Sequence, residues 1–261
     1  MKKLCFDAGH YKNYNQSKVY KPYFEGNKMW DLTLLVKNYL EKNYNVQILL
    51  TRDNINKDLS VYERGKLAKG CEGFYSFHTN AFDDETVDRV VIIRALGDTS
   101  LNTYSNQLGD SIKNCVGIKQ PTQVYERKGN NGEYYGVLRG AKSVGVKNRF
   151  IIEHGFHTNY NTAKWLYDNK NLKKLAKVEG EEIAKFHNLQ RKGSSSSSKE
   201  FKVRITCDVL RVRGGAGTNF NIVTRVKKGE AFTIIEEKNG FGLLKSKVGW
   251  ISLDDSNVKR L

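Results

Sequence analysis

Closely spaced cysteines and long apolar stretches are both absent from this sequence. The cysteines lie far apart and form no Cys-x-x-Cys pair, so neither a disulfide framework nor a thiolate zinc knuckle is indicated. They are Cys5, Cys71, Cys115 and Cys207. The apolar run in residues 2–7 is too short for a signal peptide, and no later segment is long enough to span a bilayer. We therefore expect reduced, mostly buried thiols, synthesis in the cytoplasm without a signal peptide, and no membrane insertion.

Acidic residues are scarce relative to basic ones, since 28 Asp and Glu face 44 Lys and Arg and give a formal net charge of +16. Such an excess indicates a polyanionic partner, either nucleic acid, an anionic membrane surface or a cell wall that carries teichoic acid. Charge alone does not choose among these partners. Apolar side chains are not scarce, because 39% hydrophobic and 11% aromatic residues suffice for a core and exclude wholesale disorder.

The sequence shows no internal repeat and one break in composition. At that break, Arg191-Lys192-Gly193 is followed by five serines, residues 194–198. Gly/Ser tracts of this kind cannot bury surface and usually join domains. We therefore predict a first domain over residues 1–190, a Ser-rich linker over 191–200 and a second domain over 201–261.

Short apolar runs alternate with longer segments of helical period in the first domain. Strands are predicted at residues 4–8, 46–51, 73–77, 89–95 and 150–153. Helices are predicted at 27–44, 60–69, 99–116 and 171–186, the first with Met29, Leu32, Leu35, Val36 and Leu40 on one face. This alternation indicates an α/β domain built around a central sheet.

The second domain has a different pattern. Residues alternate with period two at 202–206, 210–213, 231–236 and 242–245, followed by Gly249-Trp250-Ile251. Turn signals such as Gly214-Gly215 and Asn239-Gly240 separate these runs. The pattern predicts a small all-β barrel.

Histidines and carboxylates follow the ends of several predicted elements. His10 and His78 lie at the ends of strands, where open α/β sheets place their ligand sites. Glu25 precedes the first long helix, and Glu153 ends a later strand. Two histidines and two carboxylates could supply a His₂Glu zinc set and one spare carboxylate. Zinc hydrolases commonly use three protein ligands and leave the fourth position to a water molecule, whose pKa falls to about 7.

Simpler interpretations of these residues remain open at the level of sequence. His10 and His78 could be ordinary polar or core histidines, and Glu25 could be a carboxylate at a helix N-terminus. Glu153 directly follows the apolar run 150–152, where an unpaired carboxylate is costly to bury. His154 and His157 have no clear role, and His187 is expected at the surface or in the last turn of a helix.

Four segments resemble, in order and spacing, the zinc-dependent N-acetylmuramoyl-L-alanine amidases of the amidase-3 type. These segments are residues 6–10 (FDAGH), 24–27 (FEGN), 76–81 (SFHTNA) and 151–159 (IIEHGFHTN). The resemblance covers about residues 1–190. It implies a mainly parallel sheet with helices on both faces, and hydrolysis of the amide bond between N-acetylmuramic acid and L-alanine.

The same resemblance assigns roles residue by residue. It makes His10, Glu25 and His78 ligands of Zn²⁺ and Glu153 the catalytic carboxylate that acts as base and then as acid. Two departures concern the neighbouring segments. Tyr11-Lys12-Asn13 follows the first histidine where the family often has glycines, and residues 154–157 read His-Gly-Phe-His where the family usually has Thr-Gly-Phe-Leu.

The second domain resembles a bacterial SH3-type domain. The resemblance rests on Leu210-Arg211-Val212-Arg213, Lys228-Gly229-Glu230 and Gly249-Trp250-Ile251. It implies binding to bacterial peptidoglycan and to anionic wall polymers, with no nucleic-acid partner. An amidase joined to such a domain without a signal peptide resembles a phage endolysin or an autolysin that reaches the wall after release or non-classical export.

Two alternatives come from other functional classes. One is a cell-wall cysteine peptidase with Cys71 as nucleophile and His78 as base, although nothing near Cys71 in the sequence would stabilise its thiolate. The other is a non-enzymatic basic protein that binds wall or nucleic acid, although no RNA- or DNA-binding motif is present. Tyr134, Tyr135 and Arg139 are candidates for the substrate groove because they precede the Glu153 strand.

Overall fold

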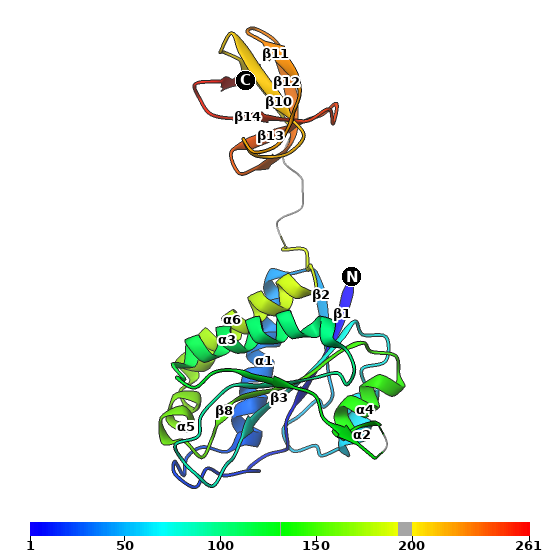
Figure 1. Ribbon diagram of the computed structural model, residues 1–261, viewed down its shortest axis with the longest axis vertical. Coiled ribbons are helices and arrows are strands. Elements are labelled where there is room, and N and C mark those ends of the chain that lie inside the picture. Colours follow the sequence, from blue (N-terminus) through cyan, green and yellow to red (C-terminus); the bar gives the residue numbers. More distant parts are fainter. Residues whose placement is uncertain (131, 193–199) are drawn as a thin grey trace. The chain divides into compact units, whose positions relative to one another are not determined.

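The computed structural model describes residues 1–130, 132–192 and 200–261 (Figure 1). The chain divides into two units, Met1–Lys192 and Gly193–Leu261. Most of the predicted Ser-rich linker, residues 193–199, lies outside the described residues. Each unit has its own buried core, so each is described separately.

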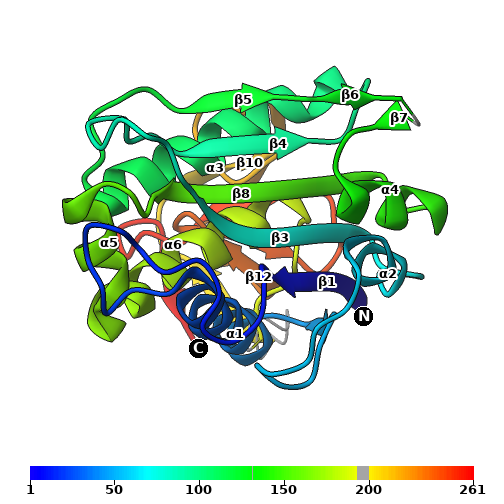
Figure 2. The same cartoon turned by 90° about the horizontal axis from the view of Figure 1, so that it is seen from below.

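A six-stranded sheet with the order β2-β1-β3-β8-β4-β5 forms the centre of the first unit (Figure 2). The strands are β1 Lys2–Ala8, β2 Val46–Leu50, β3 Gly73–Asn80, β4 Val91–Arg94, β5 Gln123–Tyr125 and β8 Asn148–Phe156. Neighbouring strands run parallel except at the β4–β8 pair, which is antiparallel. The prediction of a mainly parallel sheet is confirmed.

Helices cover both faces of this sheet, as predicted. One face packs against α1 Glu25–Asn43, α3 Asn102–Val116, α5 Tyr160–Tyr167 and α6 Asn169–Phe186. The other packs against α4 Gly136–Ser143 and against Ala68, which follows α2 Val61–Lys66 (Figures 1 and 2). None of the helices in the described residues is both long enough and apolar enough to cross a bilayer.

Side-chain alternation along β8 explains how one strand serves both cores. Phe150 and Ile152 belong to the core beneath α1, α3 and α6, whereas Ile151 belongs to the core beneath α4. Glu153 and His154 continue this alternation at the carboxyl end of the strand. These neighbouring residues therefore face opposite sides of the sheet.

Several short elements were missing from the sequence prediction. They are β5, the two-stranded ribbon β6 Lys128–Gly129 and β7 Gly132–Glu133, the helices α4 and α5, and the 3₁₀ turn Thr99–Leu101 that precedes α3. Glycine is a poor helix former, so Gly136 and Gly140 weaken the sequence signal of α4. They are needed for packing, because a Cβ on Gly140 would lie 2.1 Å from the carbonyl oxygen of Tyr62 in α2.

The second unit is all-β, as predicted. Its strands are β9 Phe201–Ile205, β10 Val209–Arg213, β11 Ile222–Lys227, β12 Ala231–Lys238, β13 Phe241–Leu244, β14 Trp250–Ser252 and β15 Val258–Arg260. They form one antiparallel sheet with the order β11-β10-β14-β13-β12-β9-β15. Within the described residues, the edge strands β11 and β15 do not pair with each other, so the expected barrel is not closed.

Candidate functional site

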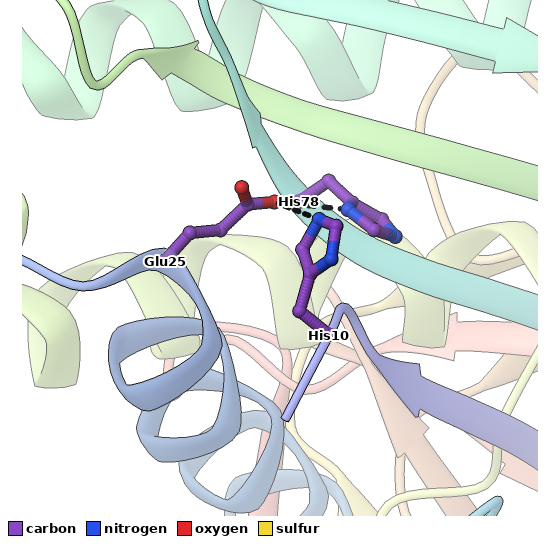
Figure 3. A group of neighbouring side chains, drawn as sticks. All are labelled: His10, Glu25 and His78. Carbon is purple, nitrogen blue, oxygen red and sulfur yellow. Dashed lines mark hydrogen bonds and ion pairs between the residues drawn. The ribbon is translucent and has the colours of Figure 1, made fainter. Parts of the chain in front are cut away.

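His10, Glu25 and His78 come together at the carboxyl edge of the sheet (Figure 3). His10 follows β1, Glu25 is the first residue of α1, and His78 lies near the end of β3. Because β1 and β3 are parallel neighbours, their carboxyl ends meet at the same edge. One ligand atom of each residue lies within 4.8 Å of the other two, so the three side chains can hold a metal ion.

The separations of the donor atoms suit a small tetrahedral cation. His78 Nδ1 lies 2.9 Å from Glu25 Oε1, and His10 Nε2 lies 3.4 Å from the same oxygen. Zinc binds nitrogen and oxygen ligands at about 2.0–2.1 Å, so two ligands on a tetrahedron lie about 3.3 Å apart. Two imidazoles and one carboxylate, with room for a water molecule, are a common ligand set of catalytic zinc.

Glu25 is held from several directions. Its side chain is 1% exposed, and it accepts hydrogen bonds from the backbone N–H of Thr79 at 3.0 Å and from Asn15 Nδ2 at 2.8 Å. Although burial alone would raise the pKa of Glu25, the hydrogen bonds and charges of His10 and His78 hold it well below its usual range. The carboxylate is therefore ionised, as metal binding requires.

The backbone around His10 and Glu25 explains the glycines in two of the sequence motifs. A Cβ on Gly9 would lie 2.4 Å from the ring of His78, and a Cβ on Gly26 would lie 1.9 Å from the carbonyl oxygen of Tyr11. His10 itself has a φ of 58°, a conformation that non-glycine residues adopt rarely and mostly at functional sites. The close approach of these segments needs both glycines.

Glu153 lies beside the three donors. It is the register partner of His78 across β3 and β8. Its Oε2 atom is buried and has no hydrogen-bond partner among the described residues. Burial raises the pKa of Glu153 to about 7, even though the charge of His78 acts in the opposite direction. A carboxylate in this state can exchange a proton near neutral pH.

His154 and His157 both lie closer to the site than the sequence indicated. His157 Nδ1 is 3.1 Å from Thr79 Oγ1 and 4.0 Å from Glu25 Oε2. His154 is fully buried between the backbone of β3 and Glu179 of α6. Glu179 lies on the buried, otherwise apolar face of α6. A carboxylate at such a position is a signal that the sequence prediction missed.

Three further predictions can be compared with the structure. Arg139 Nη1 donates to the carbonyl oxygens of Glu133 and Tyr134, so it braces the backbone. Tyr134 is exposed, and the hydroxyl of Tyr135 lies 3.0 Å from that of Tyr125. His187 is the C-cap residue of α6, in agreement with the expected place at the end of a helix, but it is buried and not at the surface, with Nε2 2.8 Å from Tyr75 Oη.

The geometry contradicts the cysteine-peptidase alternative. Cys71 is buried just before the start of β3, whereas His78 lies near the other end of the same strand. Residues 73–78 of an extended strand alone span roughly 16 Å. Cys71 and His78 therefore cannot form a catalytic pair.

Comparisons with known proteins agree with this architecture. Over 73% of this chain and the full length of the other, the fold is similar to the catalytic domain of CwlV, an N-acetylmuramoyl-L-alanine amidase from Paenibacillus polymyxa (TM-score 0.61, 19% identity). A similar likeness is found to an N-acetylmuramoyl-L-alanine amidase from Clostridium difficile 630 (TM-score 0.61, 18% identity, 72% of this chain, 97% of the other). The amidase AmiC2 of Nostoc punctiforme also matches (TM-score 0.57, 18% identity, 72% and 97%).

Sequence comparison identifies a family for each unit. No curated protein sequence matches the chain. Residues 208–257 match the bacterial SH3 domain, and residues 4–185 match the family described as N-acetylmuramoyl-L-alanine amidase. Because the second match covers well over half of the 261 residues, the chain belongs to the N-acetylmuramoyl-L-alanine amidase family.

Proposed function

We propose that this chain is a zinc-dependent amidase that cleaves the bond between N-acetylmuramic acid and L-alanine in bacterial peptidoglycan. The observation that carries the proposal is the convergence of His10, Glu25 and His78 beside Glu153 in a member of the amidase family. The donor types and separations support Zn²⁺ as the ion, since two imidazoles and a carboxylate at these distances suit tetrahedral coordination.

When bound, Zn²⁺ polarises a carbonyl group and lowers the pKa of a water molecule to about 7. In the proposed reaction, Glu153 Oε2 takes a proton from the attacking water and later gives it to the nitrogen of L-alanine. The oxygen of water thereby bonds to the lactyl carbonyl carbon, and the carbon–nitrogen bond breaks. The pKa of about 7 supports both steps, because a general base and acid works best near the ambient pH.

The residues around Glu25 are proposed to orient the metal ligands. The backbone N–H of Thr79 and the side chain of Asn15 hold the two oxygens of Glu25, which directs Oε1 towards His10 and His78. Partners of this kind fix the direction of a ligand before the metal arrives. The site is then largely formed by the fold itself.

The second domain, residues 201–261, is proposed to bind peptidoglycan and anionic wall polymers, with 191–200 as a linker. The bacterial SH3 match supports wall binding. The charge distribution supports an anionic ligand, because Arg211 and Arg225 are exposed and directly opposite each other on β10 and β11. Like charges in that position repel unless an anion lies between them. The chain would act on the bacterial cell wall.

Metal analysis of the purified chain, combined with mass spectrometry of digested wall, tests the proposal. We expect bound zinc, and wall fragments with a new L-alanine amino terminus and an intact glycan that carries free lactyl carboxylates. Absence of zinc together with absence of these termini would refute the proposal. New amino termini at other residues would instead indicate a peptidase.

A further inference from the structure

An ion pair that the proposed chemistry does not use is buried next to the site. His154 Nε2 of β8 lies 2.8 Å from Glu179 Oε1 of α6, and both side chains are 0% exposed. Two charges removed from water are costly, and a well-packed apolar pair of similar volume is often at least as stable. Folding stability alone therefore does not explain why a histidine and a glutamate, and not two apolar residues, occupy these buried positions.

The contacts of His154 lead directly to the metal donors. Its Nδ1 atom lies 2.9 Å from the backbone oxygen of His78, and its ring stacks on Phe77 with centroids 5.7 Å apart. The ring therefore has an oxygen atom close to each nitrogen, Glu179 Oε1 on one side and the backbone oxygen of His78 on the other. Glu179 thus fixes the direction of a ring that holds the peptide group of a metal donor.

The backbone of β3 needs such support at this position. The β3–β8 pairing is regular up to the pair His78 and Glu153, and then the register shifts before Asn80. At an irregularity of this kind, the strand pairing no longer fixes the direction of each peptide group. The next residue, Thr79, uses its backbone N–H to hold Glu25 Oε1 at 3.0 Å. The peptide between His78 and Thr79 therefore connects two of the three donors.

We propose that Glu179 and His154 are positioning residues for the metal site: Glu179 orients the imidazole ring of His154, which fixes the His78–Thr79 peptide and through it His78 and Glu25. The inference rests on the proposed zinc function. A positioning role predicts weaker zinc binding when the pair is removed, even where the fold is retained, because the loss of supporting partners typically costs 10- to 100-fold in metal affinity. A purely structural role predicts that zinc affinity follows folding stability.

A double substitution separates these roles. Glu179→Leu alone leaves the buried Nε2 atom of His154 without its partner, so this variant should be less stable than the wild type. In His154→Leu/Glu179→Leu both polar side chains are replaced by apolar ones, and folding stability should recover. The matched control is Glu133→Gln, which removes one charge from the buried pair between Glu133 and Arg149 at the other end of β8.

Three measurements on the full chain decide the question: zinc affinity by competition with a chelator, kcat and KM on purified wall, and urea unfolding. We expect the double variant to unfold like the wild type but to bind zinc about 10- to 100-fold more weakly, with a lower kcat and little change in KM. Glu133→Gln should lose stability and keep the zinc affinity of the wild type.

Zinc affinity of the folded double variant within twofold of the wild type would overturn the inference. If this double variant does not fold, His154→Phe/Glu179→Leu gives the same comparison, because it keeps an aromatic ring on Phe77 and removes both polar partners. Weaker zinc binding at intact fold supports the positioning role, and unchanged binding overturns it. A wild-type chain that binds no zinc overturns the proposed function itself, which distinguishes the two failures.

Discussion

Replacement of Glu153 by glutamine should separate metal retention, turnover and folding stability. The substitution keeps the shape of the side chain and removes its charge. Glu153 is not one of the three metal donors, and its Oε2 atom has no hydrogen-bond partner among the described residues. We therefore expect Glu153→Gln to bind zinc like the wild type, while turnover falls by about 10²- to 10⁴-fold through loss of the general base and acid.

The same substitution should stabilise the metal-free protein. Burial raises the pKa of Glu153 from 4.5 to about 7, so in this pH window the folded chain binds a proton that the unfolded chain has released. The stability of the wild type therefore falls as pH rises from 4.5 to 7. A pKa difference of this size corresponds to about 3 kcal/mol at pH 8, a cost that a neutral amide avoids.

Urea unfolding of the metal-free wild type and Glu153→Gln measures this difference. Relative to the wild type, the free energy of unfolding of the variant should be little changed at pH 4.5 and about 3 kcal/mol higher at pH 8. Glu85→Gln, which alters an exposed carboxylate, serves as the control and should show no such trend. A stability gain that does not grow with pH would refute the burial argument. Near-normal turnover of Glu153→Gln would show that another residue carries the proton.

Three further predictions test the site and the two units. Chelation should abolish wall digestion and added zinc should restore it, whereas His10→Ala should lose metal and activity together, since two protein ligands hold zinc poorly. Residues 1–192 alone should cleave soluble muropeptides but act weakly on whole cells. Residues 200–261 alone should sediment with purified walls, and this binding should weaken at high salt. Burial lowers the pKa of His187 to about 4, so the free energy of unfolding of the wild type should fall as pH drops from 6.5 to 4. His187→Asn should lose up to about 3 kcal/mol less over the same range in urea unfolding.

Regular elements with a clear apolar pattern could be predicted from the sequence. In α1, Met29, Leu32, Val36 and Leu40 recur at helical spacing, and all four are fully buried. The Asn239-Gly240 turn was also predictable, because both residues have positive φ between β12 and β13. Local sequence determines such features, so no tertiary information is needed to find them.

Features that depend on contacts between distant segments could not be predicted in the same way. Helix α4 was missed because its glycines serve close packing against α2 and not local helix formation. The partners of Glu25 were missed as well, since Asn15 lies in a loop and Thr79 contributes only its backbone N–H. The burial of His187 was not predicted either, because its partner, Tyr75, lies on a strand 112 positions earlier.

The candidate metal donors were found for a different reason. His10, Glu25 and His78 stand in short motifs that the family resemblance identifies one by one, although nothing local brings them together. Glu179 lies outside those motifs, and His154 stands at a position of the fourth motif where the family usually has Thr. The donors were therefore predictable from resemblance, while the residues that support them became visible only in three dimensions.

The distribution of the three donors over β1, α1 and β3 has a mechanical consequence. An ion bound to them joins residues 10, 25 and 78 as a cross-link does, and closes a long loop of the chain. That loop contains segment 11–24, where Asn13 and Asn15 have positive φ. Metal loading should therefore protect this segment from proteases and slow its amide hydrogen exchange, so the N-terminal part of the chain reports occupancy of the site without any substrate.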